Sequence, residues 1–187
     1  PGHGPRAAEA PAHRSPKGQP LDTIVVPVGG GGLISGIASY MADMAPQTRV
    51  VGMEPEGAAS LRAAFDHGGP VTLEDVDPFV DGAAVKRLGT LPYEILEANR
   101  ERLSFDTVSE GAVCTDLLNL YQSEGIIAEP AGALSVAGLH QLDLQPGSTV
   151  VCVISGGNND VLRYAEIMER SLVHRGLKHY FLVNFPQ

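Results

Sequence analysis

The sequence is poor in the features that mark several large classes of protein. It has no tryptophan and only two cysteines among 187 residues, so a disulfide framework is not favoured. Cys114 and Cys152 each lie in an apolar stretch, where buried packing is the expected role. No apolar run approaches the roughly 18 residues that a membrane helix requires, and no signal peptide stands at the first residues. These absences favour a reducing, cytoplasmic setting.

Positive charge is also scarce. Thirteen Lys and Arg residues face 22 Asp and Glu residues, which gives a formal net charge of −9. Because affinity for nucleic acid depends on clustered Lys and Arg, we expect neither nucleic acid nor an anionic membrane as a partner. The apolar fraction of 43% and the charged fraction of 19% are those of a globular protein. The length suffices for one ordinary domain with a core of its own.

The first 20 residues differ in composition from the rest of the chain. They are rich in Pro, Gly, Ala and His, and they show neither a helical nor a strand period. Such a composition does not supply enough apolar surface to order the backbone. We therefore expect residues 1–20 to be a disordered or aberrant leader.

After the leader, short apolar runs alternate with segments of helical period. The β-branched run at 23–28, four glycines and an amphipathic segment at 33–41 predict a strand, a loop and a helix. A second strand is predicted at 50–53 and a second helix at 58–65. This order indicates a parallel, doubly wound α/β sheet, in which ligands bind at the carboxyl ends of the strands.

The second half of the chain continues the alternation. In chain order, we predict an irregular stretch at 68–92, a helix at 93–99, a strand at 103–108, a helix from the cap Ser109 to about 123, a break at Pro130, a helix at 133–142, a buried strand at 149–154, a helix at 160–170 and a last strand at 178–184. Irregular stretches as long as the first of these are usually functional in compact domains.

Four glycines stand between the first predicted strand and the first predicted helix: Gly29, Gly30, Gly31 and Gly32. They leave backbone N–H groups free to converge on an anion at the positive end of a helix. A tight turn would need only one glycine, so the run favours a phosphate site. The pattern G-x-G-x-x-G/A is absent, and Leu33-Ile34 stand where a P-loop would need Lys and Ser or Thr. A dinucleotide or a nucleoside triphosphate is therefore disfavoured.

Four segments together resemble the threonine dehydratases, which are fold type II (tryptophan-synthase-β-like) pyridoxal-phosphate enzymes. They are Val28 to Leu33, Asp81 to Gly89, Ala128 to Ala133 and Ile154 to Asn158, in the order and spacing of that family. The resemblance implies that residues 21–170 are the C-terminal part of an incomplete catalytic domain. By the same resemblance, residues 171–187 are a linker and the first strand of a truncated ACT-like regulatory domain.

The resemblance also implies pyridoxal 5'-phosphate as cofactor. Gly29, Gly30, Gly31, Gly32 and Leu33 would surround its phosphate, and Ser155 would face its pyridine nitrogen. A neutral hydroxyl there makes the ring a weaker electron sink than a carboxylate would, which suits β-elimination. The resemblance implies that the intact parent enzyme is a homo-oligomer that acts on a small amino acid. Its implied reaction is the deamination of L-threonine to 2-oxobutanoate and ammonia, the first step of isoleucine biosynthesis.

Two acidic segments receive no catalytic or metal role. Glu129 would lie near the active site of the family, but an isolated carboxylate is more often solvated or a cap. The segment from Glu54 ends in Ser60, where a metal site of the racemase type would need a carboxylate ligand. We therefore expect no metal.

The Schiff-base lysine of the family has no counterpart in this sequence. In the family it lies in the N-terminal half of the catalytic domain, and Lys86 corresponds to a lysine with another role. Lys17 and Lys178 fall outside the catalytic region. We therefore expect no catalytic residue in this chain and no activity from the chain alone. Two alternatives stay open: a serine/threonine dehydratase or serine racemase of the same fold, and a non-catalytic remnant that binds a cofactor or a partner.

Overall fold

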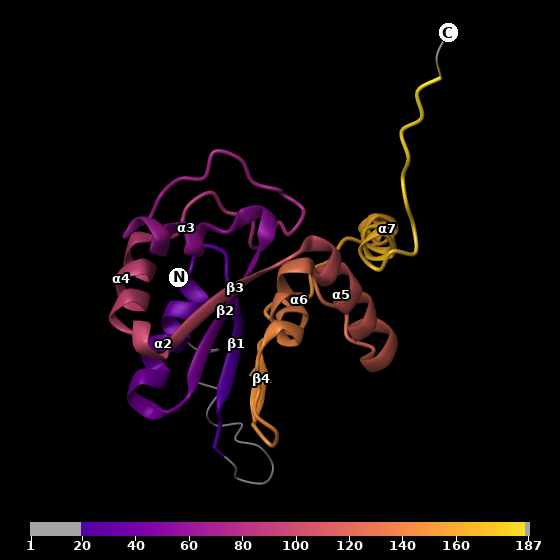
Figure 1. Ribbon diagram of the computed structural model, residues 1–187. Helices are drawn as coiled ribbons and strands as arrows, with labels where there is room; N and C mark the ends of the chain where they lie inside the picture. Colours follow the sequence, from indigo (N-terminus) through magenta and orange to yellow (C-terminus); the bar gives the residue numbers. More distant parts are fainter. Residues whose placement is uncertain (1–19, 186–187) are drawn as a thin grey trace.

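The computed structural model describes residues 20–185, so the predictions for the leader lie outside the described residues except at Pro20. A four-stranded parallel sheet with the order β3-β2-β1-β4 forms its centre (Figure 1). The strands are β1 (Thr23–Pro27), β2 (Arg49–Pro55), β3 (Leu103–Val108) and β4 (Val150–Cys152). The predicted parallel, doubly wound α/β fold is confirmed.

Helices cover both faces of the sheet (Figure 1). One face packs against α2 (Gly32–Met44), α3 (Ser60–His67) and α4 (Thr90–Ala98), and the other against α5 (Glu110–Glu124), α6 (Pro130–Ala137) and α7 (Tyr164–His174). Short 3-10 helices lie at 56–58, 100–102, 138–141 and 161–163. Each face therefore has an apolar core of its own, separated from the other by the sheet.

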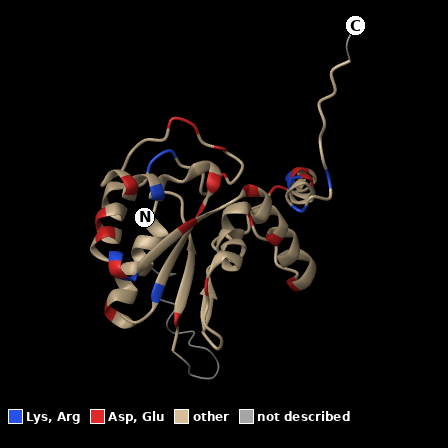
Figure 2. Ribbon diagram, viewed as in Figure 1, with Lys and Arg blue, Asp and Glu red and all other residues tan. Residues whose placement is uncertain are grey.

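The central strand β1 explains why the sequence shows an unbroken apolar run. Ile24 and Val26 are fully buried in the core with α2 and α3, whereas Val25 is fully buried in the core with α5 and α6. Successive side chains of a strand point to opposite faces, so a strand covered on both sides needs apolar residues throughout. In Figure 2 the strands are mostly tan, and most of the charged residues lie on helices and loops.

Several predicted boundaries in the second half of the chain differ from the structure, and two of the differences have a clear physical reason. Pro130, predicted as a break, is the first residue of α6. A backbone N–H at this position would have no acceptor within the helix, and the fixed φ of proline suits a helix, so proline is favourable there. The predicted strand at 149–154 shortens to three half-buried residues in β4, because this strand pairs only with β1 and lies at the edge of the sheet.

The prediction of a strand at 178–184 is wrong. Residues 178–185 have no regular secondary structure and run away from the domain (Figure 1). A strand requires hydrogen bonds to a neighbour, and no strand of the described residues lies beside this segment. Its apolar side chains stay exposed, Leu182 by 94%. Residues 171–174, predicted as linker, form the last turn of α7. The assignment of 171–187 to an ACT-like domain stays a prediction.

Both cysteines are free thiols. Cys114 is fully buried as predicted, whereas Cys152 on the edge strand is only half-buried. Burial raises the pKa of Cys114 to about 12 and that of Cys152 to about 11, so both stay protonated near neutral pH. Within residues 20–185, no helix combines the length and the apolar character that crossing a bilayer would require.

Candidate functional site

A pocket of about 450 Å³ lies between the turn that follows β1 and the turn that follows β4. Its lining consists of Pro27, Gly29, Gly30, Gly31, Gly32, Leu33, Gly82, Pro92, Glu129, Ala131 and Ser155. All six residues that the sequence predicts as cofactor ligands are therefore brought together in one pocket. The volume falls in the range that small-molecule sites commonly have. The part that these residues play in binding stays a prediction.

The glycine loop leads directly into the N-terminus of α2. Gly31 is the N-cap residue, has a φ of +86°, and makes no side-chain cap. The first N–H groups of a helix have no partner inside the helix, and the helix dipole places partial positive charge there. Because no side chain caps them, these donors can converge on an anion.

The four glycines serve two different purposes. A Cβ on Gly31 would lie 2.6 Å from Leu88 Cδ1, and one on Gly29 would lie 2.9 Å from Ala83 Cα, so packing leaves no room for a side chain at either position. A Cβ on Gly30 or Gly32 would meet no heavy atom within 4 Å. At these two positions the space is open, so the packing of the described residues does not require a glycine there.

The second turn, after β4, is held by the backbone at the start of α6. Glu129 N–H donates to the Gly156 carbonyl over 3.1 Å. A Cβ on Gly132 would collide with that same carbonyl, and a Cβ on Gly157 would lie 2.7 Å from the Ile127 carbonyl. These close approaches fix the segment that carries Ser155 to the pocket wall.

Glu129 lies in the pocket wall, beside both glycine-containing segments. A Cβ on Gly156 would collide with its carboxylate, and one on Gly82 would lie 3.3 Å from Oε1. Although Glu129 is the N-cap residue of α6, its side chain does not cap the helix. The carboxylate therefore contributes an acidic group to the pocket, a position that the sequence resemblance indicated without giving it a role.

The sequence reasoning did not single out four other lining residues. Gly82 and Ala131 fall inside two segments that resemble the threonine dehydratases, so the resemblance was the signal that could have found them. Pro27 ends β1, directly before the glycine loop. Pro92 lies in the first turn of α4, and only the packing of α4 against α2 brings it to the pocket.

No lysine among the described residues lines the pocket. Lys86 Nζ donates to the Glu74 carbonyl over 2.7 Å at the surface. Lys178 Nζ contacts the Glu169 carboxylate at 2.6 Å. Lys17 lies outside the described residues. The described part of the chain thus offers no amine that could attack a bound carbonyl in this pocket.

Glu54 occupies the N-terminus of a second helix, α3. Its side chain is 1% exposed and accepts from Leu61 N–H at 2.5 Å and from Arg62 N–H at 2.9 Å. Burial raises the pKa of Glu54 to about 7, although the two amides lower it in part. Among the residues that the structure describes, no cluster of three or more His, Cys, Asp or Glu could hold a metal ion. Glu54 is therefore a buried helix cap.

Comparison with known proteins assigns the chain to a family. Residues 9–156 match the family model described as "Pyridoxal-phosphate dependent enzyme". The chain is similar to "L-threonine dehydratase biosynthetic IlvA" of Corynebacterium glutamicum, with 67% identity over 186 residues. That alignment covers 100% of this chain and 43% of the relative, so the chain spans less than half the length of the curated protein it matches.

Solved structures with the same fold support this assignment. The processed form of threonine deaminase isoform 2 from Solanum lycopersicum has a TM-score of 0.80 at 28% identity, over 91% of this chain and 49% of that one. Maize serine racemase has a TM-score of 0.75 at 27% identity, over 94% of this chain and 53% of that one. Both structures extend well beyond the part that this chain matches.

Proposed function

The chain belongs to the family of pyridoxal-phosphate-dependent enzymes, and we propose that it supplies the part of a threonine dehydratase catalytic domain that holds the cofactor phosphate. The observation that carries this proposal is the uncapped N-terminus of α2, with open space beside Gly30 and Gly32. The residues present fit a phosphate monoester, because the loop offers backbone donors and the dipole of α2 favours an anion.

Each predicted ligand has a defined task in this proposal. Backbone N–H groups from Gly29 to Leu33 would hold the phosphate, and Ser155 would lie beside the pyridine ring. When bound, pyridoxal 5'-phosphate supplies an electron sink for the bonding electrons released at the substrate Cα. Because its hydroxyl is neutral, Ser155 would hold the ring without fixing a positive charge on the ring nitrogen. Proton removal at Cα and covalent attachment are assigned to groups outside residues 20–185, since no lysine there lines the pocket.

For the parent protein we propose the deamination of L-threonine to 2-oxobutanoate and ammonia, the first step of isoleucine biosynthesis. The support is the 67% identity to a protein named L-threonine dehydratase biosynthetic IlvA. We further propose that the parent is a cytoplasmic homo-oligomer acting on a small amino acid. The chain alone is proposed to be inactive, because the nucleophilic lysine of such enzymes has no equivalent in the pocket.

Two other functions are weighed against this one. A serine dehydratase or serine racemase is supported by the likeness to maize serine racemase, but at 27% identity and not 67%. A non-catalytic, cofactor-binding remnant is supported by the absence of a lysine from the pocket lining among the described residues. The serine enzymes and the remnant predict different results, since only a chain from a serine enzyme would gain activity when the catalytic lysine is supplied by a second polypeptide.

The test supplies those groups in a second polypeptide. The full chain is titrated with pyridoxal 5'-phosphate, the N-terminal half of a related threonine dehydratase is added, and release of 2-oxobutanoate from L-threonine is measured. We expect product only from the mixture, and the chain with Gly30→Asp should need a higher concentration of pyridoxal 5'-phosphate to give it. A higher kcat/KM for serine than for threonine would favour the serine enzymes. A folded mixture that binds cofactor and yields no product would favour the remnant.

A further inference from the structure

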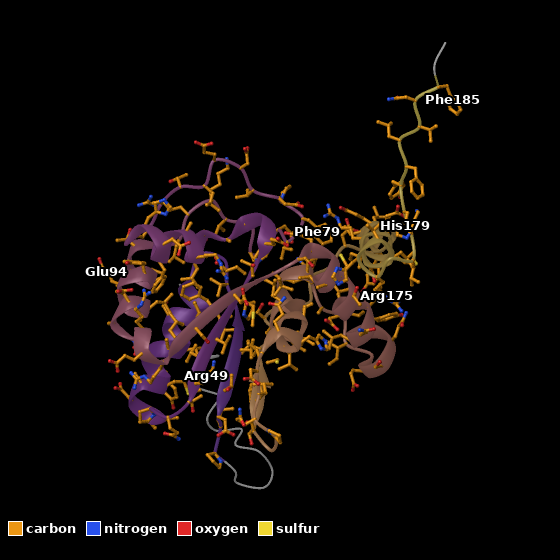
Figure 3. The ribbon with its side chains drawn as sticks, in the orientation of Figure 1. Arg49, Phe79, Glu94, Arg175, His179 and Phe185 are labelled. Carbon is orange, nitrogen blue, oxygen red and sulfur yellow. The ribbon has the colours of Figure 1, made fainter. Side chains whose placement is uncertain are left out.

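One buried aromatic ring joins the long loop before α4 to the last helix. Phe79 is 4% exposed, and the Cζ atoms of Arg163 and Arg170 lie 4.9 Å and 4.1 Å from its ring centroid. Figure 3 shows Phe79 where this loop meets α7, and Figure 2 shows that α7 carries charges of both signs. Guanidinium groups over an aromatic face are attracted by the quadrupole of the ring. The loop is thus attached to α7 and to the 3-10 helix directly before it through one ring that contacts two cations.

Polar contacts strengthen this attachment. Arg163 Nη2 donates to the Phe79 carbonyl at 2.5 Å, and Arg163 Nη1 donates to Asp81 Oδ2 at 3.3 Å. Arg170 Nη1 donates to Asp77 Oδ2 at 3.4 Å, while Asp77 Oδ1 accepts from Phe79 N–H at 2.8 Å. Residues 77–81 therefore meet the two arginines at several points within one short segment.

The attachment continues into the pocket wall. Asp81 Oδ1 accepts from Gly82 N–H at 2.9 Å, so a single carboxylate links Arg163 to a residue that lines the pocket. On the far side, a Cβ on Gly29 would lie 2.9 Å from Ala83 Cα and 3.3 Å from the Gly82 carbonyl. Because the two backbones touch here, a shift of Gly82 and Ala83 leaves Gly29 without its support.

We propose that Arg163 and Arg170 are positioning residues for the glycine loop, although neither lines the pocket. By holding residues 77–82 against α7, they set the place of Gly82 and Ala83, which in turn support Gly29. The stretch at 68–89 has no helix or strand of its own, so its position depends on such side-chain contacts. The proposal rests on the proposed function only in the choice of pyridoxal 5'-phosphate as the ligand measured.

The test compares ligand affinity with global stability. In the full chain, Arg163→Gln and the double variant Arg163→Gln with Arg170→Gln are titrated with pyridoxal 5'-phosphate, and the melting temperature is recorded. We expect the dissociation constant to rise about tenfold in the double variant, since small misplacements of binding groups have large effects. Backbone hydrogen exchange at 82–84 is expected to accelerate by about the same factor, because the acceptors of these amides, Asp81 Oδ1 and the Val80 carbonyl, are then held less firmly.

A matched control exists on the other face of the sheet. Arg62 pairs with Asp106 at 2.7 Å and lies 6.0 Å from the ring centroid of Phe105. Arg62→Gln therefore removes the same kinds of contact without touching residues 77–83. We expect its dissociation constant to stay within about twofold of the unchanged chain, as for surface ion pairs in general.

The outcomes separate the two proposals. Equal dissociation constants for the Arg62→Gln and Arg163→Gln chains, with equal exchange at 82–84, would overturn the positioning role. If the unchanged chain did not bind pyridoxal 5'-phosphate, the proposed function would fail, and exchange at 82–84 alone would decide the positioning role. Should the double variant not fold, Asp81→Asn removes the ion pair while keeping Phe79 in place, and faster exchange at 82–84 is again the expected result.

Discussion

The helices α2 and α3 begin at the carboxyl ends of the neighbouring strands β1 and β2, yet their N-termini differ. In α3, the carboxylate of Glu54 accepts from two first-turn amides inside the protein. In α2, no side chain caps the first turn, and the glycine loop opens into a pocket. The start of α5 lies between these two cases, because one first-turn amide has a side-chain acceptor: the Ser109 hydroxyl accepts from Ala112 N–H at 3.3 Å.

The comparison of α2 with α3 indicates under which condition a helix N-terminus can bind a ligand. All helices carry unpaired first-turn amides and a positive dipole end. Where the protein provides its own hydrogen-bond acceptor, as Glu54 does for α3, these groups stabilise the fold. Where glycines replace every capping side chain, as before α2, the same groups remain for an external anion.

The largest expected effect comes from disrupting the α2 turn itself. Gly31→Ala places a Cβ 2.6 Å from Leu88 Cδ1 and 2.9 Å from Pro92 Cβ, in a residue with a φ of +86°. The left-handed backbone and the overpacking together are expected to lower the free energy of unfolding by about 3 to 4 kcal/mol. Urea unfolding measures this loss. A loss below about 1 kcal/mol would show that the turn tolerates a side chain.

The next largest effect is a pH dependence at the α3 turn. The folded-state pKa of Glu54, about 7, lies above its ordinary value of 4.5 because of burial. The folded protein thus binds the Glu54 proton more tightly than the unfolded chain does. The stabilisation from the protonated side chain is therefore complete below pH 4.5 and is lost as the pH rises through 7. Relative to Glu54→Gln, the unchanged chain is expected to lose about 3 kcal/mol across this range. Urea unfolding of both proteins from pH 4.5 to 8 measures the difference, and a constant difference would contradict the buried acid.

A third prediction converts the α2 turn into one like that of α3. Gly30→Asp adds a carboxylate where a Cβ meets no atom within 4 Å, so the protein then supplies its own anion. The dissociation constant for pyridoxal 5'-phosphate is expected to rise at least about 30-fold, or about 2 kcal/mol. Unfolding free energy is expected to change by less than about 1 kcal/mol. The neutral control Gly30→Asn should weaken binding less, and equal effects of the two variants would argue against an anion site.

The smallest effect is expected at the capped start of α5. Ser109→Ala removes the hydroxyl that accepts from Ala112 N–H and is expected to cost about 1 kcal/mol of unfolding free energy. Affinity for pyridoxal 5'-phosphate should not change, since Ser109 does not line that pocket. A combined measurement of urea unfolding and ligand titration checks both parts. A change in affinity alone would place Ser109 in the ligand site, contrary to the structure.

The sequence predicted the parts of this fold that depend on local pattern. The strand at 103–108 and the cap at Ser109 lie where predicted, because short strand patterns and capping hydroxyls act within a few residues of chain. The glycine loop and Ser155 were likewise found from the segments that hold them. Pro130 was misjudged because a proline can either interrupt a helix or occupy its first position. Only the surrounding backbone decides which of the two occurs.

Long-range contacts set the features that the sequence did not predict. Pro92 reaches the pocket only through the packing of α4 on α2. The continuous apolar run at 180–183 is a good strand pattern. A strand forms only with a partner, however, and the pattern of one segment does not show whether a partner lies beside it. The buried carboxylate of Glu54 was noted for metal chemistry, whereas its partners are amides of α3, seven and eight residues further along the chain.

The unequal surroundings of the four glycines also bear on how this gene drifts over generations. Purifying selection acts on Gly29 and Gly31 as long as the protein must fold, since any side chain there collides with its neighbours. At Gly30 and Gly32 the protein itself has no such need, so selection at these two codons persists only while the pocket is used. In a lineage that abandoned the cofactor, substitutions would accumulate first at Gly30 and Gly32, and the loop would record the loss before the fold did.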